Sequence, residues 1–108
     1  MLILPIKKKW FDMILSGEKK EEYREIKSYY QSRLNDMVQT GYHTIRLRNG
    51  YSSKSPIIEC DVEVRIDYGK EKWGAEPNTL YYVIEIIEIL DVENVKESDL
   101  KCHLHTEE

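Results

Sequence analysis

Three charged residues near the N-terminus, Lys19, Glu22 and Arg24, are the side chains of this chain best suited to chemistry. They follow a short helical pattern that ends at Ser16-Gly17. If the chain after this point is extended, Glu22 and Arg24 are two residues apart and point to the same face of a strand. Lysine and arginine donate hydrogen bonds to phosphate or carbonyl oxygens, whereas glutamate accepts from a base amino group or acts as a general base. The alternative is a charged edge strand that resists aggregation.

A second candidate group lies in the middle of the chain. Arg46 and Arg48 alternate with apolar residues, and the Asn49-Gly50 turn and Tyr51 follow them. Two arginines on one strand face can clamp a phosphate, and a neighbouring tyrosine can stack on a base. The alternative is a solvated outer face on which the arginines pair with acidic residues such as Glu59.

The loop Trp73-Gly74-Ala75-Glu76 is the third candidate group. Trp73 looks exposed in this polar loop, where it either caps the core from outside or forms a stacking lid over a ligand. In the second case Glu76 contributes an acid to the site. Cys102, His103 and His105 form a weaker candidate for a metal cluster. Because metal ligands this close together usually need a further ligand elsewhere in the chain, we expect neither a metal nor another cofactor.

Composition describes a soluble, globular, single-domain chain. A chain of 108 residues is long enough to bury a core without disulfides,. Its hydrophobic fraction of 41% and charged fraction of 33% are typical of a soluble globular protein,. No apolar run approaches the roughly 20 residues of a membrane-spanning helix. The short apolar run before Lys7-Lys8-Lys9 reverses the order of a secretory signal, so we expect a cytoplasmic protein. The net charge of −4 gives no overall attraction to nucleic acid,. Basic residues gather in the first half, which is compatible either with a local anion site or with ordinary surface charge.

Apolar periodicity predicts five strands and two short helices. We expect helices over residues 6–16 and 26–37, and strands near residues 2–4, 20–24, 44–48, 58–68 and 79–90,. The adjacent Ile86 and Ile87 break the alternation of the last strand, which indicates a β-bulge and a bend. The prediction is an α+β fold, a small and mostly antiparallel β-barrel with two short helices flanking a cleft. We expect one domain over residues 1–97 and a flexible C-terminal tail over 98–108.

A longer pattern contains the first candidate group and reads Trp10…Ile14…Ser16-Gly17-Glu18-Lys19…Glu22-Tyr23-Arg24. It resembles the ASCH (activating signal cointegrator homology) domain, whose hallmark has the form GxKxxExR. Three later segments look like the small stand-alone ASCH proteins of bacteria and their phages: Arg48-Asn49-Gly50-Tyr51, Trp73-Gly74 and residues 81–86. The resemblance extends to about Leu90. It implies a barrel of the PUA (pseudouridine synthase and archaeosine transglycosylase) superfamily, with a helix beside a cleft that binds RNA or a nucleotide.

The resemblance also implies that Lys19, Glu22 and Arg24 line this cleft. One ASCH-like branch hydrolyses acetylated cytidine with a lysine, a threonine and a glutamate. Lys19 matches that lysine, Glu22 stands where the threonine is expected, and Glu76 is the candidate for the glutamate.

Three functions therefore stay open at this point. The leading one is binding of single-stranded RNA or a nucleotide, in which arginines such as Arg24, Arg46 and Arg48 hold phosphate and Tyr51 or Trp73 stacks on a base. The second is an amidohydrolase for a modified nucleoside, with Lys19 and Glu22 as catalytic residues. The third is a protein-interaction module. The sequence does not define an oligomeric state.

Overall fold

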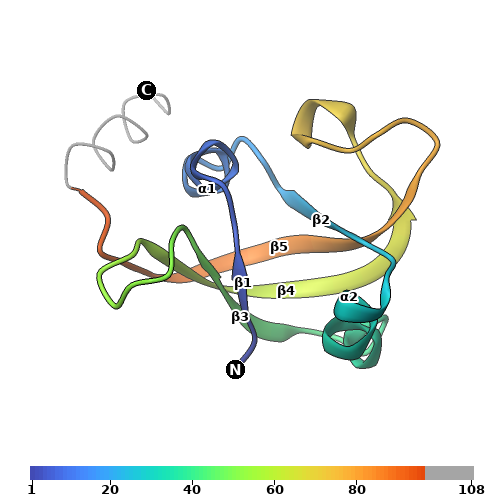
Figure 1. Ribbon diagram of the computed structural model, residues 1–108, viewed down its shortest axis with the longest axis horizontal. Coiled ribbons are helices and arrows are strands. Elements are labelled where there is room, and N and C mark those ends of the chain that lie inside the picture. Colours follow the sequence, from blue (N-terminus) through green and yellow to red (C-terminus); the bar gives the residue numbers. More distant parts are fainter. Residues whose placement is uncertain (97–108) are drawn as a thin grey trace.

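A computed structural model describes residues 1–96 of the chain (Figure 1). The predicted tail over residues 98–108, with Cys102, His103 and His105, lies outside the described residues. Within residues 1–96, no helix has both the length and the apolar character that crossing a bilayer requires.

The described chain forms five strands, two α-helices and two short 3-10 helices. In chain order these are β1 (Ile3–Pro5), α1 (Lys8–Leu15), β2 (Glu21–Glu25), α2 (Ser28–Leu34), η1 (Asn35–Met37), β3 (His43–Arg48), β4 (Ile57–Tyr68), η2 (Glu71–Trp73) and β5 (Leu80–Glu93). All five predicted strands are present. The second helix is shorter than predicted, because its last turn tightens into the 3-10 helix η1.

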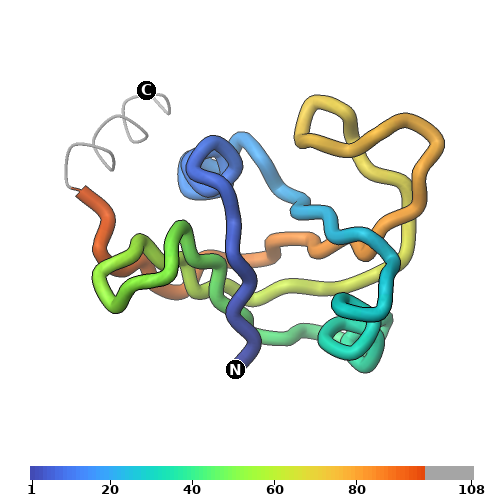
Figure 2. The backbone as a smooth tube through the Cα atoms, viewed as in Figure 1, coloured from blue at the N-terminus to red at the C-terminus, as the bar shows by residue number. Residues whose placement is uncertain are grey.

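The strands form one curled sheet in the order β1-β3-β4-β5-β2. β1 runs parallel to β3, whereas the other three pairings are antiparallel, so the sheet is mixed. Figures 1 and 2 show the sheet wrapping around as half a barrel. The predicted α+β class is confirmed, but the predicted barrel is open, because the edge strands β1 and β2 do not pair with each other.

The curl follows from the bulged pairing of the two longest strands. In β5, Ile86 and Glu88 pair with consecutive residues of β4, Val62 and Asp61, which leaves Ile87 as an extra residue. This confirms the bulge predicted there, and a second register shift follows further along β5. Each extra residue increases the local twist and bends the strand.

The core lies on the concave face of the half-barrel. Alternate residues of β3 and β4 point into it, and α1 adds Phe11 and Ile14 while α2 adds Leu34. The apolar residues of α1 recur three apart and therefore share one face. Because α1 precedes β2 and α2 follows it, the strand β2 runs between the two helices (Figure 2).

Candidate functional site

The open side of the half-barrel, between β1 and β2, is here called the seam. The backbone N–H of Ile6 donates to the carbonyl of Arg48 in β3, so the backbone groups of the preceding residue, Pro5, point away from β3. Proline also lacks an N–H and is suited to an edge strand. Instead of a backbone ladder, Arg24 of β2 bridges the seam, with its Nη2 2.7 Å from the carbonyl oxygen of Pro5.

Lys19, Glu22 and Arg24 form one buried group, here called the seam cluster. Their exposed fractions are 1%, 6% and 9%. The Glu22 carboxylate lies between the two cations, with Oε2 2.7 Å from Arg24 Nη2 and Oε1 3.2 Å from Lys19 Nζ. The prediction that Glu22 and Arg24 share a strand face is therefore confirmed. A carboxylate between two buried cations stays ordered because each of its oxygens has a charged partner.

Lys19 is turned inward rather than toward solvent. Its ammonium donates to the carbonyl oxygen of Trp73 and lies 4.5 Å and 5.0 Å from the ring centroids of Trp10 and Tyr23. Burial lowers the pKa of Lys19, and the attraction of Glu22 partly offsets this effect. The side chain is fully shielded from solvent, and its bond to Trp73 ties the loop to the segment just before β2.

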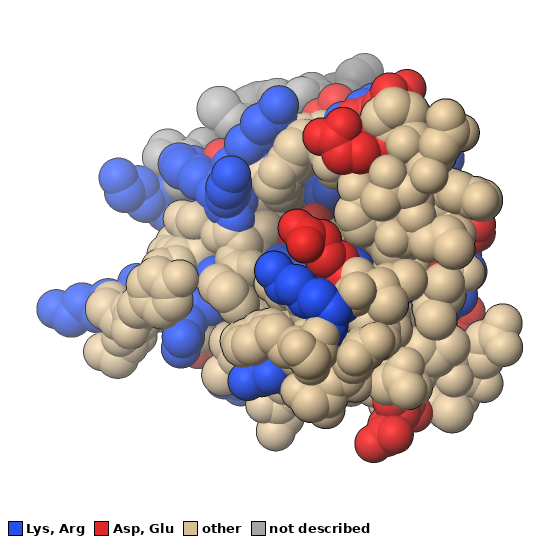
Figure 3. All heavy atoms as spheres, turned by 45° about the vertical axis from the view of Figure 1, so that its right-hand side comes forward, with Lys and Arg blue, Asp and Glu red and all other residues tan. Residues whose placement is uncertain are grey.

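A cleft of about 440 Å³ opens along the seam beside this cluster. That volume lies within the roughly 300–1,000 Å³ typical of small-molecule sites. Acidic and basic side chains are neighbours on this face of the molecule (Figure 3). The lining comes from the end of β1 and the two residues after it, from β2, from one residue in each helix and the lysine before α2, and from the loop before β5 and the start of β5. The residues are Pro5, Ile6, Lys7, Trp10, Glu22, Tyr23, Arg24, Glu25, Lys27, Tyr30, Gly74, Glu76 and Tyr81.

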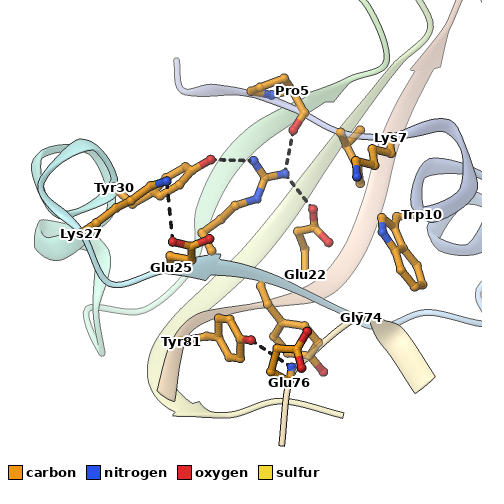
Figure 4. A pocket seen from close by; sticks show the side chains of 13 residues that line it. Pro5, Lys7, Trp10, Glu22, Glu25, Lys27, Tyr30, Gly74, Glu76 and Tyr81 are labelled. Atoms are coloured by element: carbon orange, nitrogen blue, oxygen red, sulfur yellow. Dashed lines mark hydrogen bonds and ion pairs between the residues drawn. The ribbon is translucent and has the colours of Figure 1, made fainter. Parts of the chain in front are cut away.

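The cleft has aromatic walls and charged rims. Trp10 and Tyr30 lie on opposite sides of Glu22 (Figure 4). Lys7 and Lys27 are exposed cations of the lining. The cleft thus combines aromatic rings, hydrogen-bond acceptors and cations, and these are the groups that contact a base and a phosphate in single-stranded nucleic acid complexes. Lysine or arginine side chains already lie over both rings, so a base that stacks on either ring must displace one of them.

Four of the predicted residues meet at this site. Glu22, Arg24 and Glu76 line the cleft, and Lys19 lies directly behind Glu22. The backbone N–H of Glu76 donates to the hydroxyl of Tyr81 at 2.9 Å, which fixes the loop at this wall of the cleft.

The other four predicted residues are placed elsewhere. Arg46 pairs with Glu59 at 2.9 Å on the outer face of the sheet, as the solvated alternative predicted, and Arg48 Nε donates to the carbonyl of Gly50. Trp73 is not exposed, since only 6% of it reaches solvent. The expectation of an exposed ring was wrong: Lys19 binds the backbone carbonyl of Trp73, and the side chains of Lys70 and Lys72 lie over its ring.

Tyr51, in contrast, is 84% exposed and lines a separate hollow next to the cleft. The structure therefore brings it near the site without placing it in the cleft itself.

Sequence reasoning missed several members of the lining: Lys7, Trp10, Lys27, Tyr30 and Tyr81. Trp10 and Tyr30 lie on helices at spacings that also fit core positions. Helical periodicity therefore could not distinguish a residue of the core from a residue of the cleft lining. For Tyr81 the usable signal was its neighbour Tyr82, because consecutive strand residues point to opposite faces. Tyr82 joins the main core, and Tyr81 packs with Ala75 and Val83 on the other face.

Among residues 1–96, no group of three or more histidine, cysteine, aspartate or glutamate side chains is arranged to hold a metal ion. No protein-family model, curated protein or solved structure matches the chain, so its resemblance to the ASCH domain stays a prediction.

Proposed function

We propose that the seam cleft binds one nucleotide of a single-stranded RNA. The observation that carries this proposal is the meeting of aromatic walls, carboxylate acceptors and cations in one cleft of nucleotide-compatible size. The proposal includes the PUA-like, mostly antiparallel identity of the half-barrel and a cytoplasmic location, both of which rest on sequence alone.

The free edge of β2 supports binding of a base. The N–H of Ile86 donates to the carbonyl of Lys20, so the backbone groups of Lys20, Glu22 and Arg24 face β5 by the alternation of an antiparallel pair. The N–H and C=O of Tyr23 then face the seam, and Tyr23 is part of the cleft lining. An adjacent donor and acceptor can pair with one edge of an unpaired base.

Phosphate is assigned to the cationic rim. Lys27 lies at the start of α2, and its Nζ is 3.7 Å from a carboxylate oxygen of Glu25, a loose contact that a phosphate can replace. Arg24 Nη1 has only a long contact of 3.4 Å with the Tyr30 hydroxyl and can turn part of its donor capacity to a ligand,.

The test is a fluorescence-anisotropy titration with short single-stranded RNA, with double-stranded RNA of the same sequence as the control. We expect the single strand to bind several-fold more tightly, and Lys27→Ala to weaken its binding. The matched control is Lys20→Ala, an exposed lysine that does not line the cleft. Absence of binding to single-stranded RNA, or equal loss in both variants, contradicts the proposal.

The second candidate is hydrolysis of an amide on a modified nucleoside. It is favoured by Glu22, whose carboxylate lines the cleft while contacting Lys19. The shielding of the Lys19 ammonium favours binding over this reaction, because a substrate would reach Lys19 only by displacing a side chain that covers it, such as Glu22 or Trp10. Incubation with acetylated cytidine separates the two functions: turnover that is lost in Glu76→Gln, with folding intact, establishes the hydrolase.

A further inference from the structure

A second hollow of about 340 Å³ adjoins the cleft. Six residues line it: Pro5, Ile6, Lys7, Asn49, Gly50 and Tyr51. The first three also line the cleft, so the end of β1 and the two residues after it form a partition with one hollow on each side. A ligand long enough to cross the partition would contact both hollows.

Lys7 is the cation of this partition. It is exposed, it contributes to both linings, and within residues 1–96 no carboxylate lies within ion-pair distance of it. Figure 4 shows its side chain between Pro5 and Trp10. An unpaired cation between two hollows is suited to the phosphate that joins two nucleotides.

Tyr51 is an exposed ring on a loop that is held in place. Asn49 Nδ2 donates to the carbonyl of Ile6 at 2.8 Å and ties the start of the loop to the partition. Ser52 N–H donates to the buried hydroxyl of Ser55 at 3.0 Å. Gly50 has a φ of 123°, a conformation that favours glycine,. An aromatic ring that projects into solvent from an anchored loop is a stacking platform of the kind used for single strands.

We propose that this hollow is a second nucleotide subsite, in which Tyr51 stacks on the base adjacent to the one in the cleft. Lys7 holds the phosphate between the two nucleotides. The partition keeps the two bases apart, so the strand must be single and at least two nucleotides long. This inference rests on the proposed function, because the first nucleotide is the one bound in the cleft.

The experiment compares ligand length. AMP, CMP, GMP and UMP are titrated separately, followed by the RNA trimer of whichever base binds best. We expect the trimer to bind more tightly than the mononucleotide, and Tyr51→Ala to weaken only the trimer, by about 5- to 150-fold. Tyr51→Phe keeps the aromatic ring and should restore trimer binding. Tyr42→Ala, at another exposed tyrosine outside both hollows, should change neither affinity.

The outcomes separate the two proposals. A mononucleotide that binds while the trimer gains nothing, or a trimer unaffected by Tyr51→Ala, overturns the second subsite and leaves the cleft intact. If neither ligand binds, both proposals fail. Lys7→Ala adds an independent readout, since it should reduce the salt dependence of trimer binding, whereas Lys20→Ala should not.

Discussion

Glu22 is the residue on which the seam cluster depends, because it is the shared partner of two buried cations. Glu22→Gln keeps the shape of the side chain and removes its charge, so Lys19 and Arg24 lose their counter-charge. We expect a loss of about 3 kcal/mol in the free energy of unfolding, measured by urea denaturation. Glu25→Gln, on the same strand but 72% exposed, should cost less than about 0.5 kcal/mol. Equal losses would show that the cluster contributes no special stability.

Lys19 gives the cluster a pH dependence whose sign can be derived. Burial lowers its pKa in the folded protein below the ordinary value of 10.5. As the pH rises, the folded protein therefore releases this proton before the unfolded chain does. Between the two pKa values the unfolded chain binds more protons, so the contribution of Lys19 to the free energy of unfolding rises with pH.

The measurement is urea denaturation of the wild type and Lys19→Met from about pH 7 to about pH 10.5. We expect the difference in unfolding free energy, wild type minus variant, to increase over this range. Lys20→Met is the control at a neighbouring exposed position and should give a constant difference. A difference that decreases with pH would mean that Glu22, rather than burial, dominates the pKa of Lys19.

At the scale of elements, the half-barrel is joined across its seam by Arg24 rather than by a strand ladder. Arg24→Lys keeps the charge but removes the planar fork that reaches Glu22 and Pro5 at once. We expect faster amide hydrogen exchange in β1 and β2 and in the amides of β3 and β5 that bond to them, with β4 unchanged, and a loss of about 1–3 kcal/mol in unfolding free energy,. Arg33→Lys, on the exposed face of α2, is the control. Unchanged exchange at the seam would show that Arg24 does not join the edges.

At the scale of the whole molecule, the net charge of −4 opposes any general attraction to RNA,. Binding should then depend only on the few cations at the cleft. With phosphate on Lys7 and Lys27, we expect a plot of log affinity against log salt concentration to have a slope of about −1.4, at roughly −0.7 per phosphate contact. A slope near zero contradicts phosphate binding, and one steeper than about −3 points to another basic surface.

The fold was predictable where the pattern is long. Twelve residues of regular alternation defined β4, and the adjacent Ile86 and Ile87 indicated the bulge in β5. The strand order was not predictable, because β1 and β2 are three and five residues long and carry too few side chains to specify their neighbours. The open seam depends on that order, so it could not be predicted either.

The site was predictable where two residues share a strand. The two-residue period placed Glu22 beside Arg24, but it assigned Arg46 and Arg48 only to a polar face and did not say that this face lies away from the cleft. The position of Trp73 beside the seam cluster could not be foreseen, because its backbone carbonyl is bound by Lys19, 54 residues away. Contacts between distant segments are the part of the site that local patterns do not contain.

The pairing of β2 with β5 also dictates when the site can form during synthesis. Glu25 of β2 pairs with Tyr81 of β5, so about 60 further residues must leave the ribosome before β2 gains its neighbour. At the usual 5–20 residues per second this takes roughly 3 to 12 seconds. We expect Lys19, Glu22 and Arg24 to stay hydrated on the nascent chain throughout that interval, and their charges to protect this early segment from aggregation until the last strand arrives.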